Sequence, residues 1–152
     1  VRLDMTGGMA RNVVIPRLPE LLQLHPLLAL EISSTDRRVD LVREGFDCVL
    51  RAGPVLDTSL VARPMHPMRM ANCASPAYLQ AHGTPRTLDD LAHHQLVHYA
   101  VEVLPAHAAP PMPFTLLYAN RRNLSKRVRV VMDWLVEVVQ AHVLACDGVG
   151  AP

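Results

Sequence analysis

This chain of 152 residues contains few aromatic side chains, few cysteines and almost no excess charge. Aromatic residues make up only 4% of it, so a hydrophobic core has to be built from Leu, Val, Ala and Met. The formal net charge of +1 is too small to indicate direct binding to nucleic acid or to an anionic membrane surface. No apolar run is long enough to cross a bilayer, and no export signal opens the chain. We therefore expect a cytoplasmic location and no membrane partner.

The residue types that build metal and catalytic sites are present but not in a recognisable arrangement. The cysteines are far apart in the sequence, at Cys48, Cys73 and Cys146. Without redox or metal-ligand spacing, they are expected to be reduced thiols. His93 and His94 lack an acidic or thiol partner at ligand spacing, so no metal and no cofactor are predicted. No nucleophile-elbow motif occurs, so the sequence predicts no catalytic residue and no enzyme.

The hydrophobic pattern predicts an α/β fold. Strand-like alternation and helical spacing follow one another through the first third of the chain, and this βαβαβ order favours a parallel sheet with right-handed crossovers. The elements expected there are a strand at 2–5, a helix interrupted by Pro16 and Pro19, a strand at 28–33, a helix at 37–44 and a strand at 47–51. Those expected later are a helix from Ser75 to Gly83, a short helix opened by Thr87 and Asp90, strands at 96–99, 101–104 and 114–118, and a long helix capped by Ser125.

Five stretches of the sequence, taken together and in order, carry a family resemblance. They are RNVVIPRLPELL at 11–22, GFDCVLRAG at 45–53, LVARPM at 60–65, ASPAYL at 74–79 and NLSKRVRVVMDWL at 123–135. In this order they resemble the effector-binding domain of LysR-type transcriptional regulators. The resemblance implies a two-lobed fold like that of periplasmic binding proteins, with Rossmann-like lobes and a small effector in the cleft between them. It also implies a homodimer or tetramer that contacts DNA only through an N-terminal winged helix-turn-helix, which this chain lacks.

The same resemblance implies the division into lobes. Residues 1–72 with 119–152 would form the first lobe and residues 73–118 the second. Family members carry a long segment between the strands that match 96–99 and 101–104, whereas here Ala100 runs directly into Val101. The second lobe would also be smaller than the roughly 70–80 residues at which one core becomes self-sufficient. We therefore expect the second lobe to be incomplete.

The candidate ligand site lies where the first three strands end. The predicted ligand-binding residues are Thr6, Gly7, Gly8, Met9, Ser33, Ser34, Arg51 and Ser75. Glycines at a helix N-terminus permit close backbone approach and favour an anion, although a plain turn could also require them. Arg51 could pair with an effector carboxylate or form a surface or interlobe salt bridge. The serines could donate hydrogen bonds to an effector or act as helix caps.

The function expected from these features is the sensing of a small anionic effector by a transcriptional regulator. Effector binding would shift the population toward a closed arrangement and so reposition the DNA-binding domains. Three alternatives remain open from the sequence: a solute-binding protein for transport of a small anion, an enzyme built on an open α/β sheet, and a degenerate remnant that folds poorly.

Overall fold

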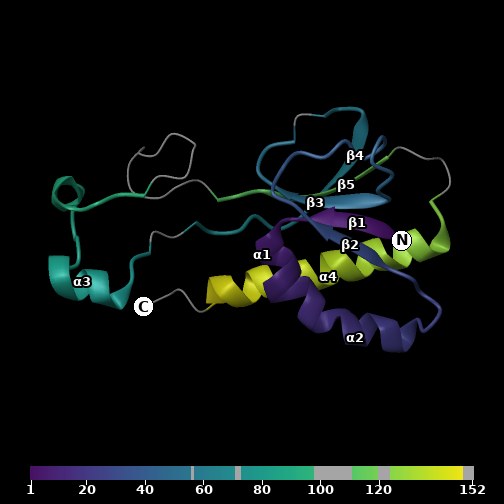
Figure 1. The fold of residues 1–152 in the computed structure, drawn as a ribbon, viewed down its shortest axis with the longest axis horizontal. Helices are drawn as coiled ribbons and strands as arrows, with labels where there is room; N and C mark the ends of the chain where they lie inside the picture. Colours follow the sequence, from purple (N-terminus) through teal and green to yellow (C-terminus); the bar gives the residue numbers. More distant parts are fainter. Residues whose placement is uncertain (56, 71–72, 98–110, 120–123, 149–152) are drawn as a thin grey trace. The chain divides into compact units, whose positions relative to one another are not determined.

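The computed structural model describes residues 1–55, 57–70, 73–97, 111–119 and 124–148 (Figure 1). The chain forms two compact units, one of Val1–Met68 with Met112–Pro152 and one of Arg69–Pro111. The strand at 114–119, assigned to the second lobe in the sequence analysis, pairs within the sheet of the first unit because it closes the gap between two earlier strands. The junction of Ala100 and Val101 lies outside the described residues. In the described part, no helix is both long and apolar enough to span a membrane.

The first unit is built on a five-stranded mixed sheet, which confirms the α/β class. The strands are β1 (Arg2–Met5), β2 (Glu31–Ser34), β3 (Cys48–Ala52), β4 (Leu60–Pro64) and β5 (Phe114–Ala119). Their order is β2-β1-β3-β5-β4, with β1 parallel to both β2 and β3. The strand β5 runs antiparallel to β3 and β4. The expected βαβ arrangement therefore occupies one half of the sheet, and β2 begins three residues later than the alternation suggested.

The helix after β1 changes its winding just before the first of its two prolines, Pro16. It consists of α1 (Gly7–Met9), a π-helical turn η1 (Ala10–Val14) and α2 (Ile15–Leu24). Pro16 has no N–H to donate to Asn12, and in a regular helix its ring would clash with that carbonyl. The wider turn avoids the clash, and the N–H of Ile15 bonds to the carbonyl of Ala10 instead. The helix that was expected to be interrupted is therefore continuous, with a π segment before Pro16 and with Pro19 inside α2.

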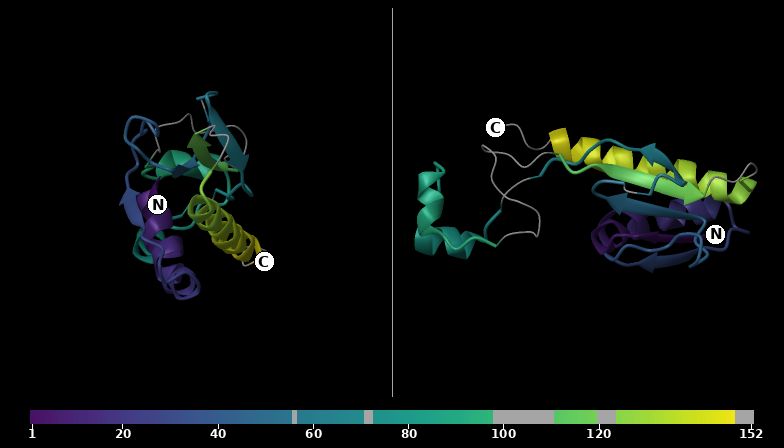
Figure 2. Two further views of the ribbon diagram at one scale, coloured as in Figure 1. Left: turned by 90° about the vertical axis from the view of Figure 1, so that its right-hand side faces the viewer. Right: turned by 90° about the horizontal axis from the view of Figure 1, so that it is seen from above.

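Helices cover one face of the sheet (Figures 1 and 2). Leu3 and Met5 of β1 point into this layer, where they meet residues of η1, α2 and α4 (Lys126–Gly148). As expected, Ser125 caps α4, accepting the N–H of Val128 at 3.3 Å. The largest fully buried side chains of this core are those of Leu3, Met5, Val14, Leu21, Leu50, Leu116, Val131, Leu135, Val138, Val139 and Val143.

The expected helix at 37–44 is wrong, because the chain there forms an irregular segment with turns at 41–45. The Asp40 carboxylate accepts the N–H of Arg43, and the Glu44 carboxylate accepts the N–H of Asp40. Side chains that bind nearby backbone in this way compete with helical hydrogen bonds. The segment, called the 35–47 segment below, instead buries Leu41 and Phe46 in a small second core with Val49 and Leu117.

The second unit is small and contains the capping motifs that the sequence predicts. Ser75 caps α3 (Pro76–His82) by accepting the N–H of Tyr78 at 3.2 Å, and Gly83 ends that helix with φ +81°. Thr87 and Asp90 bond reciprocally at the start of the 3₁₀ helix η2 (Asp89–His93). Neither helix contains a buried residue. Leu96 and Val97 are not in a strand, and the expected strand at 101–104 lies outside the described residues.

The three thiols differ in exposure, which gives a first testable result. Cys48 is buried in β3, and burial raises the pKa of its thiol to about 12, so almost no thiolate exists near neutral pH. Cys73 and Cys146 are exposed. We expect iodoacetamide to modify Cys73 and Cys146 in the native protein and Cys48 only in denaturant, as measured by peptide mass spectrometry. Rapid native labelling of Cys48 would contradict its burial.

Candidate functional site

The carboxyl ends of the three parallel strands meet at one edge of the sheet, called the β1–β3 edge below. Met5 of β1 lies opposite Ser34 of β2 and opposite Leu50 of β3. The next residue along each strand therefore falls in one row, which consists of Thr6, Thr35 and Arg51. Open α/β sheets bind ligands at such edges. The structure thus brings the predicted Thr6, Ser34 and Arg51 to the same place.

The glycine turn at this edge is open. An ideal Cβ on Gly7 or Gly8 would meet no atom within 4 Å, and Gly8 is exposed. Neither residue has the positive φ that would require glycine. The first N–H groups of a helix have no acceptor within it, and the Asp36 carboxylate accepts that of Gly7 at 3.3 Å. The turn therefore presents accessible backbone donors rather than a conformation that only glycine can adopt.

Behind this row lies a buried ion pair that the sequence analysis missed. The side chain of Asp4 is 0% exposed, and that of Arg51 is 16% exposed. Arg51 donates from Nη2 to the Asp4 carboxylate and from Nη1 to the carbonyl of Leu50 at 3.0 Å. The hydroxyl of Thr35 donates to the same carboxylate, at 3.1 Å from Oδ2. One buried carboxylate therefore ties together the ends of β1, β2 and β3.

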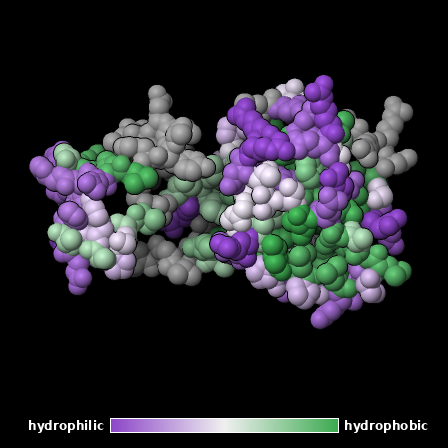
Figure 3. All heavy atoms as spheres, in the orientation of Figure 1, coloured by the Kyte–Doolittle hydropathy of each residue, from purple (hydrophilic) through white to green (hydrophobic). Residues whose placement is uncertain are grey.

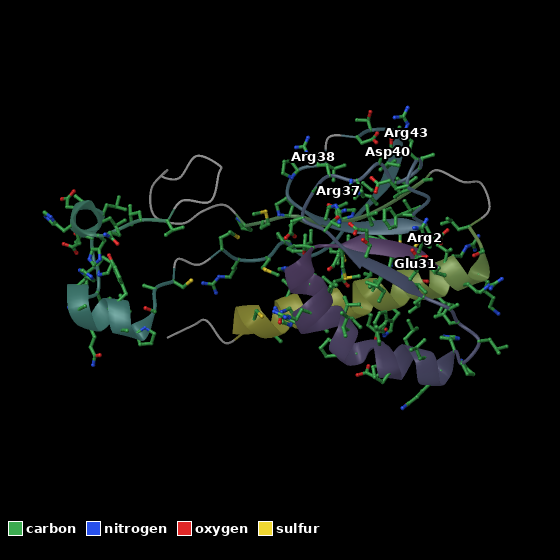
Figure 4. The ribbon with its side chains drawn as sticks, viewed as in Figure 1. Arg2, Glu31, Arg37, Arg38, Asp40 and Arg43 are labelled. Atoms are coloured by element: carbon green, nitrogen blue, oxygen red, sulfur yellow. The ribbon has the colours of Figure 1, made fainter. Side chains whose placement is uncertain are left out.

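A second ion pair lies in the 35–47 segment next to the first. Arg37 holds Glu44 through two bonds, at 3.0 Å and 2.6 Å. This hydrogen bonding lowers the pKa of Glu44, helped by the positive charge of Arg51, and it raises the pKa of Arg37, helped by the negative charge of Asp4. The two ion pairs therefore interact electrostatically. Figure 4 shows Arg37 and its neighbours Arg38, Asp40 and Arg43 projecting from the segment.

The remaining predicted site residues have different surroundings. Ser33 is half-buried in β2 opposite Asp4, and Met9 has its side chain in the core. Only the backbone of Met9 is available to a ligand. Ser75 belongs to the second unit, where its hydroxyl caps α3. Among the described residues, no group of three His, Cys, Asp or Glu side chains is arranged to hold a metal ion.

A sequence signal for the missed ion pair does exist. Asp4 stands between Leu3 and Met5 in β1, and these three residues are buried whereas Arg2 is exposed. An ionised carboxylate at such a position needs a cationic partner, because an unpaired buried charge is very costly. Its partner Arg51 is 47 positions away, so neighbouring sequence does not identify it.

Comparison with known protein families and proteins gives a consistent result. Residues 1–103 match the family model of the LysR substrate binding domain. The uncharacterized HTH-type transcriptional regulator YhjC of Escherichia coli K12 is 31% identical over 204 residues, which cover 93% of this chain and 68% of that protein. Since 204 exceeds the length of this chain, YhjC contains residues within the matched stretch that have no counterpart here. The HTH-type transcriptional regulator DmlR of the same strain is 38% identical over 92 residues, covering 60% of this chain and 30% of DmlR.

Solved structures show the same fold. The regulatory domain of CrgA, a LysR-type transcriptional regulator from Neisseria meningitidis, aligns with a TM-score of 0.75 at 22% identity, covering 90% of this chain and 97% of that domain. The effector domain of AmpR from Pseudomonas aeruginosa aligns with a TM-score of 0.65 at 17% identity, covering 95% and 96%. Both are regulatory or effector domains of transcriptional regulators. From the family match over two thirds of its length, this chain belongs to the LysR substrate-binding-domain family.

Proposed function

We propose that this chain senses a small anionic effector at the β1–β3 edge, as the regulatory part of a LysR-type transcriptional regulator. The observation that carries the proposal is the open turn at Gly7 and Gly8, which presents helix N-terminal N–H groups directly after Thr6, in the row that also holds Arg51. A carboxylate there would accept from the backbone of Gly8 and from the hydroxyl of Ser34. No bond is made or broken in such a role.

The geometry also suggests how binding would be transmitted. Asp36 holds the N–H of Gly7 and belongs to the 35–47 segment, so an effector that takes this N–H would release Asp36. Binding energy that differs between two arrangements of a segment shifts their populations. In the intact regulator we propose that this shift reaches DNA through an N-terminal winged helix-turn-helix.

We also propose that the chain acts as a homodimer or tetramer. Exposed hydrophobic residues gather over the helical layer of the first unit (Figure 3). In α2 they include Ile15, which is 49% exposed, and Leu24, which is 75% exposed, and in α4 they include Leu144, which is 55% exposed. Exposed hydrophobic side chains on helices are typical of surfaces that contact another protein.

The site is tested by blocking the glycine turn. Because a Cβ on Gly8 meets no neighbouring atom, Gly8→Val should fold normally while filling the space that a ligand needs. We expect sodium acetate to cause saturable shifts of the Gly8 and Met9 amide signals in ¹⁵N–¹H correlation spectra of the wild-type chain. In Gly8→Val the dissociation constant for acetate should rise at least about tenfold, which is the loss of one good charge-assisted hydrogen bond.

Two controls separate this result from general effects. Sodium chloride at the same ionic strength reports shifts caused by salt alone. Ala81→Val enlarges an exposed side chain in α3 of the second unit, outside the unit that carries the β1–β3 edge, and should leave acetate binding unchanged. Equal acetate affinity in the wild-type and Gly8→Val chains would remove the turn from the site.

A further inference from the structure

The two ion pairs described above, Arg51 with Asp4 and Arg37 with Glu44, carry no net charge. The two guanidinium groups are each held by a carboxylate, Arg51 by Asp4 and Arg37 by Glu44. A third carboxylate, that of Asp36, is on the N–H of Gly7. The positive end of the helix dipole, about half a charge, is the remaining attraction for an anion. The ion pairs therefore do not neutralise a bound anion, and a second negative charge on a ligand would be repelled by the buried Asp4 carboxylate without gaining a further cation.

We propose that Asp4 is the specificity-determining residue of this edge and limits the effector to a single negative charge. The inference deepens the proposed effector site and rests on it. Arg51 has five N–H donors, and its bonds to Asp4 and to the Leu50 carbonyl engage two of its nitrogens. The partly exposed guanidinium can therefore still donate to one carboxylate, while its charge is already balanced by Asp4.

The burial of Asp4 makes this effect strong. Its side chain is 0% exposed, so neither water nor salt can reach the carboxylate to screen it. It cannot contact a ligand itself, and it acts through its charge and through its hold on Arg51. At an effective dielectric constant of about 20 and a separation of about 8 Å, one buried charge changes the affinity for each ligand charge by more than tenfold, and we use about tenfold as a conservative value.

The test compares two probes of nearly equal size, malonate with two charges and monomethyl malonate with one. Both are titrated into the wild-type chain at slightly alkaline pH and matched ionic strength, and amide shifts of Gly8 and Met9 are followed. In the wild type, malonate should bind no more tightly than the monoester. In Asp4→Asn, which keeps the shape of the side chain, affinity should rise about tenfold for the monoester and about a hundredfold for malonate.

A matched control removes one carboxylate from the opposite edge of the same sheet. Glu31 lies at the amino end of β2 and forms an exposed pair with Arg2. Glu31→Gln changes the net charge as Asp4→Asn does, but it should leave the ratio of the two affinities at its wild-type value. The ratio is the informative readout, because a merely structural role for Asp4 would weaken both probes alike.

The outcomes distinguish failure of the charge limit set by Asp4 from failure of the effector site itself. Malonate binding measurably tighter than the monoester in the wild type overturns the assignment of Asp4, even if Asp4→Asn does not fold. So does an unchanged ratio in a folded Asp4→Asn. If neither probe nor acetate gives a saturable shift in the wild type, the proposed effector site itself fails, and the assignment fails with it. Binding that is present but indifferent to Asp4 leaves the site standing and removes only the charge limit.

Discussion

Replacement of Arg51 by methionine is expected to lower the free energy of unfolding by about 3–5 kcal/mol, because it leaves a buried carboxylate without its counterion. Asp4 is fully buried, and Thr35 alone would remain to donate to it. Methionine fills much of the same volume as arginine, so the loss of stability reflects the missing charge more than missing packing contacts. Urea denaturation followed by circular dichroism measures the change. A small domain has only about 5–15 kcal/mol in total, so the variant should lose a large fraction of its stability.

Two comparisons make this result specific. Arg63 of β4 pairs with Asp133 of α4 in an exposed ion pair with side-chain exposures of 42% and 69%, so Arg63→Met should cost no more than about 1 kcal/mol. The double change Asp4→Leu with Arg51→Met removes both charges and should recover much of the stability lost in Arg51→Met. Equal losses for Arg51→Met and Arg63→Met would show that Asp4 does not depend on its partner.

The fold of the first unit could be predicted from local signals. The alternation at 2–5 predicts β1, the apolar spacing after it predicts the following helix, and Ser125 predicts the start of α4. Each of these patterns lies within or beside the element that it predicts. The 35–47 segment could not be predicted in this way. Its Asp40 and Glu44 bind backbone N–H groups and Arg37, so side chains that favour a helix in isolation stabilise an irregular turn here. Tertiary contacts of this kind override propensity.

In the candidate site too, some residues could be predicted from local signals and others depend on tertiary contacts. The glycine turn is a contiguous motif, and the end of β3 follows from the strand pattern, so Gly7, Gly8 and Arg51 could be placed at one edge. The partner of Arg51 required knowing that β1 and β3 are neighbours and which residues lie in register. Without the register, a surface or interlobe salt bridge was the natural alternative for Arg51. The structure shows instead a buried pair within the first unit.

The second large effect on stability is expected from a change in the core of the first unit, at Leu135 of α4. Leu135 of α4 is 1% exposed and belongs to the core shared by the sheet and η1. Leu135→Ala should lower the free energy of unfolding by about 2–5 kcal/mol, since it removes buried methyl groups and leaves a cavity. The helix α4 is far along the chain from β1 and β3, but its residues share one core with Leu3, Met5 and Leu50. Its docking on the sheet therefore also stabilises the strands that form the β1–β3 edge.

Leu144 is the matched control for this change, because it lies in the same helix but is 55% exposed. Leu144→Ala has the same effect on helix propensity and should change stability by no more than about 0.5 kcal/mol. Measured at several protein concentrations, the pair also separates packing from self-association. A loss in Leu144→Ala that grows with protein concentration would indicate that this residue is covered by a second copy. If Leu135→Ala cost no more than Leu144→Ala, α4 would not be docked on the sheet as the structure shows.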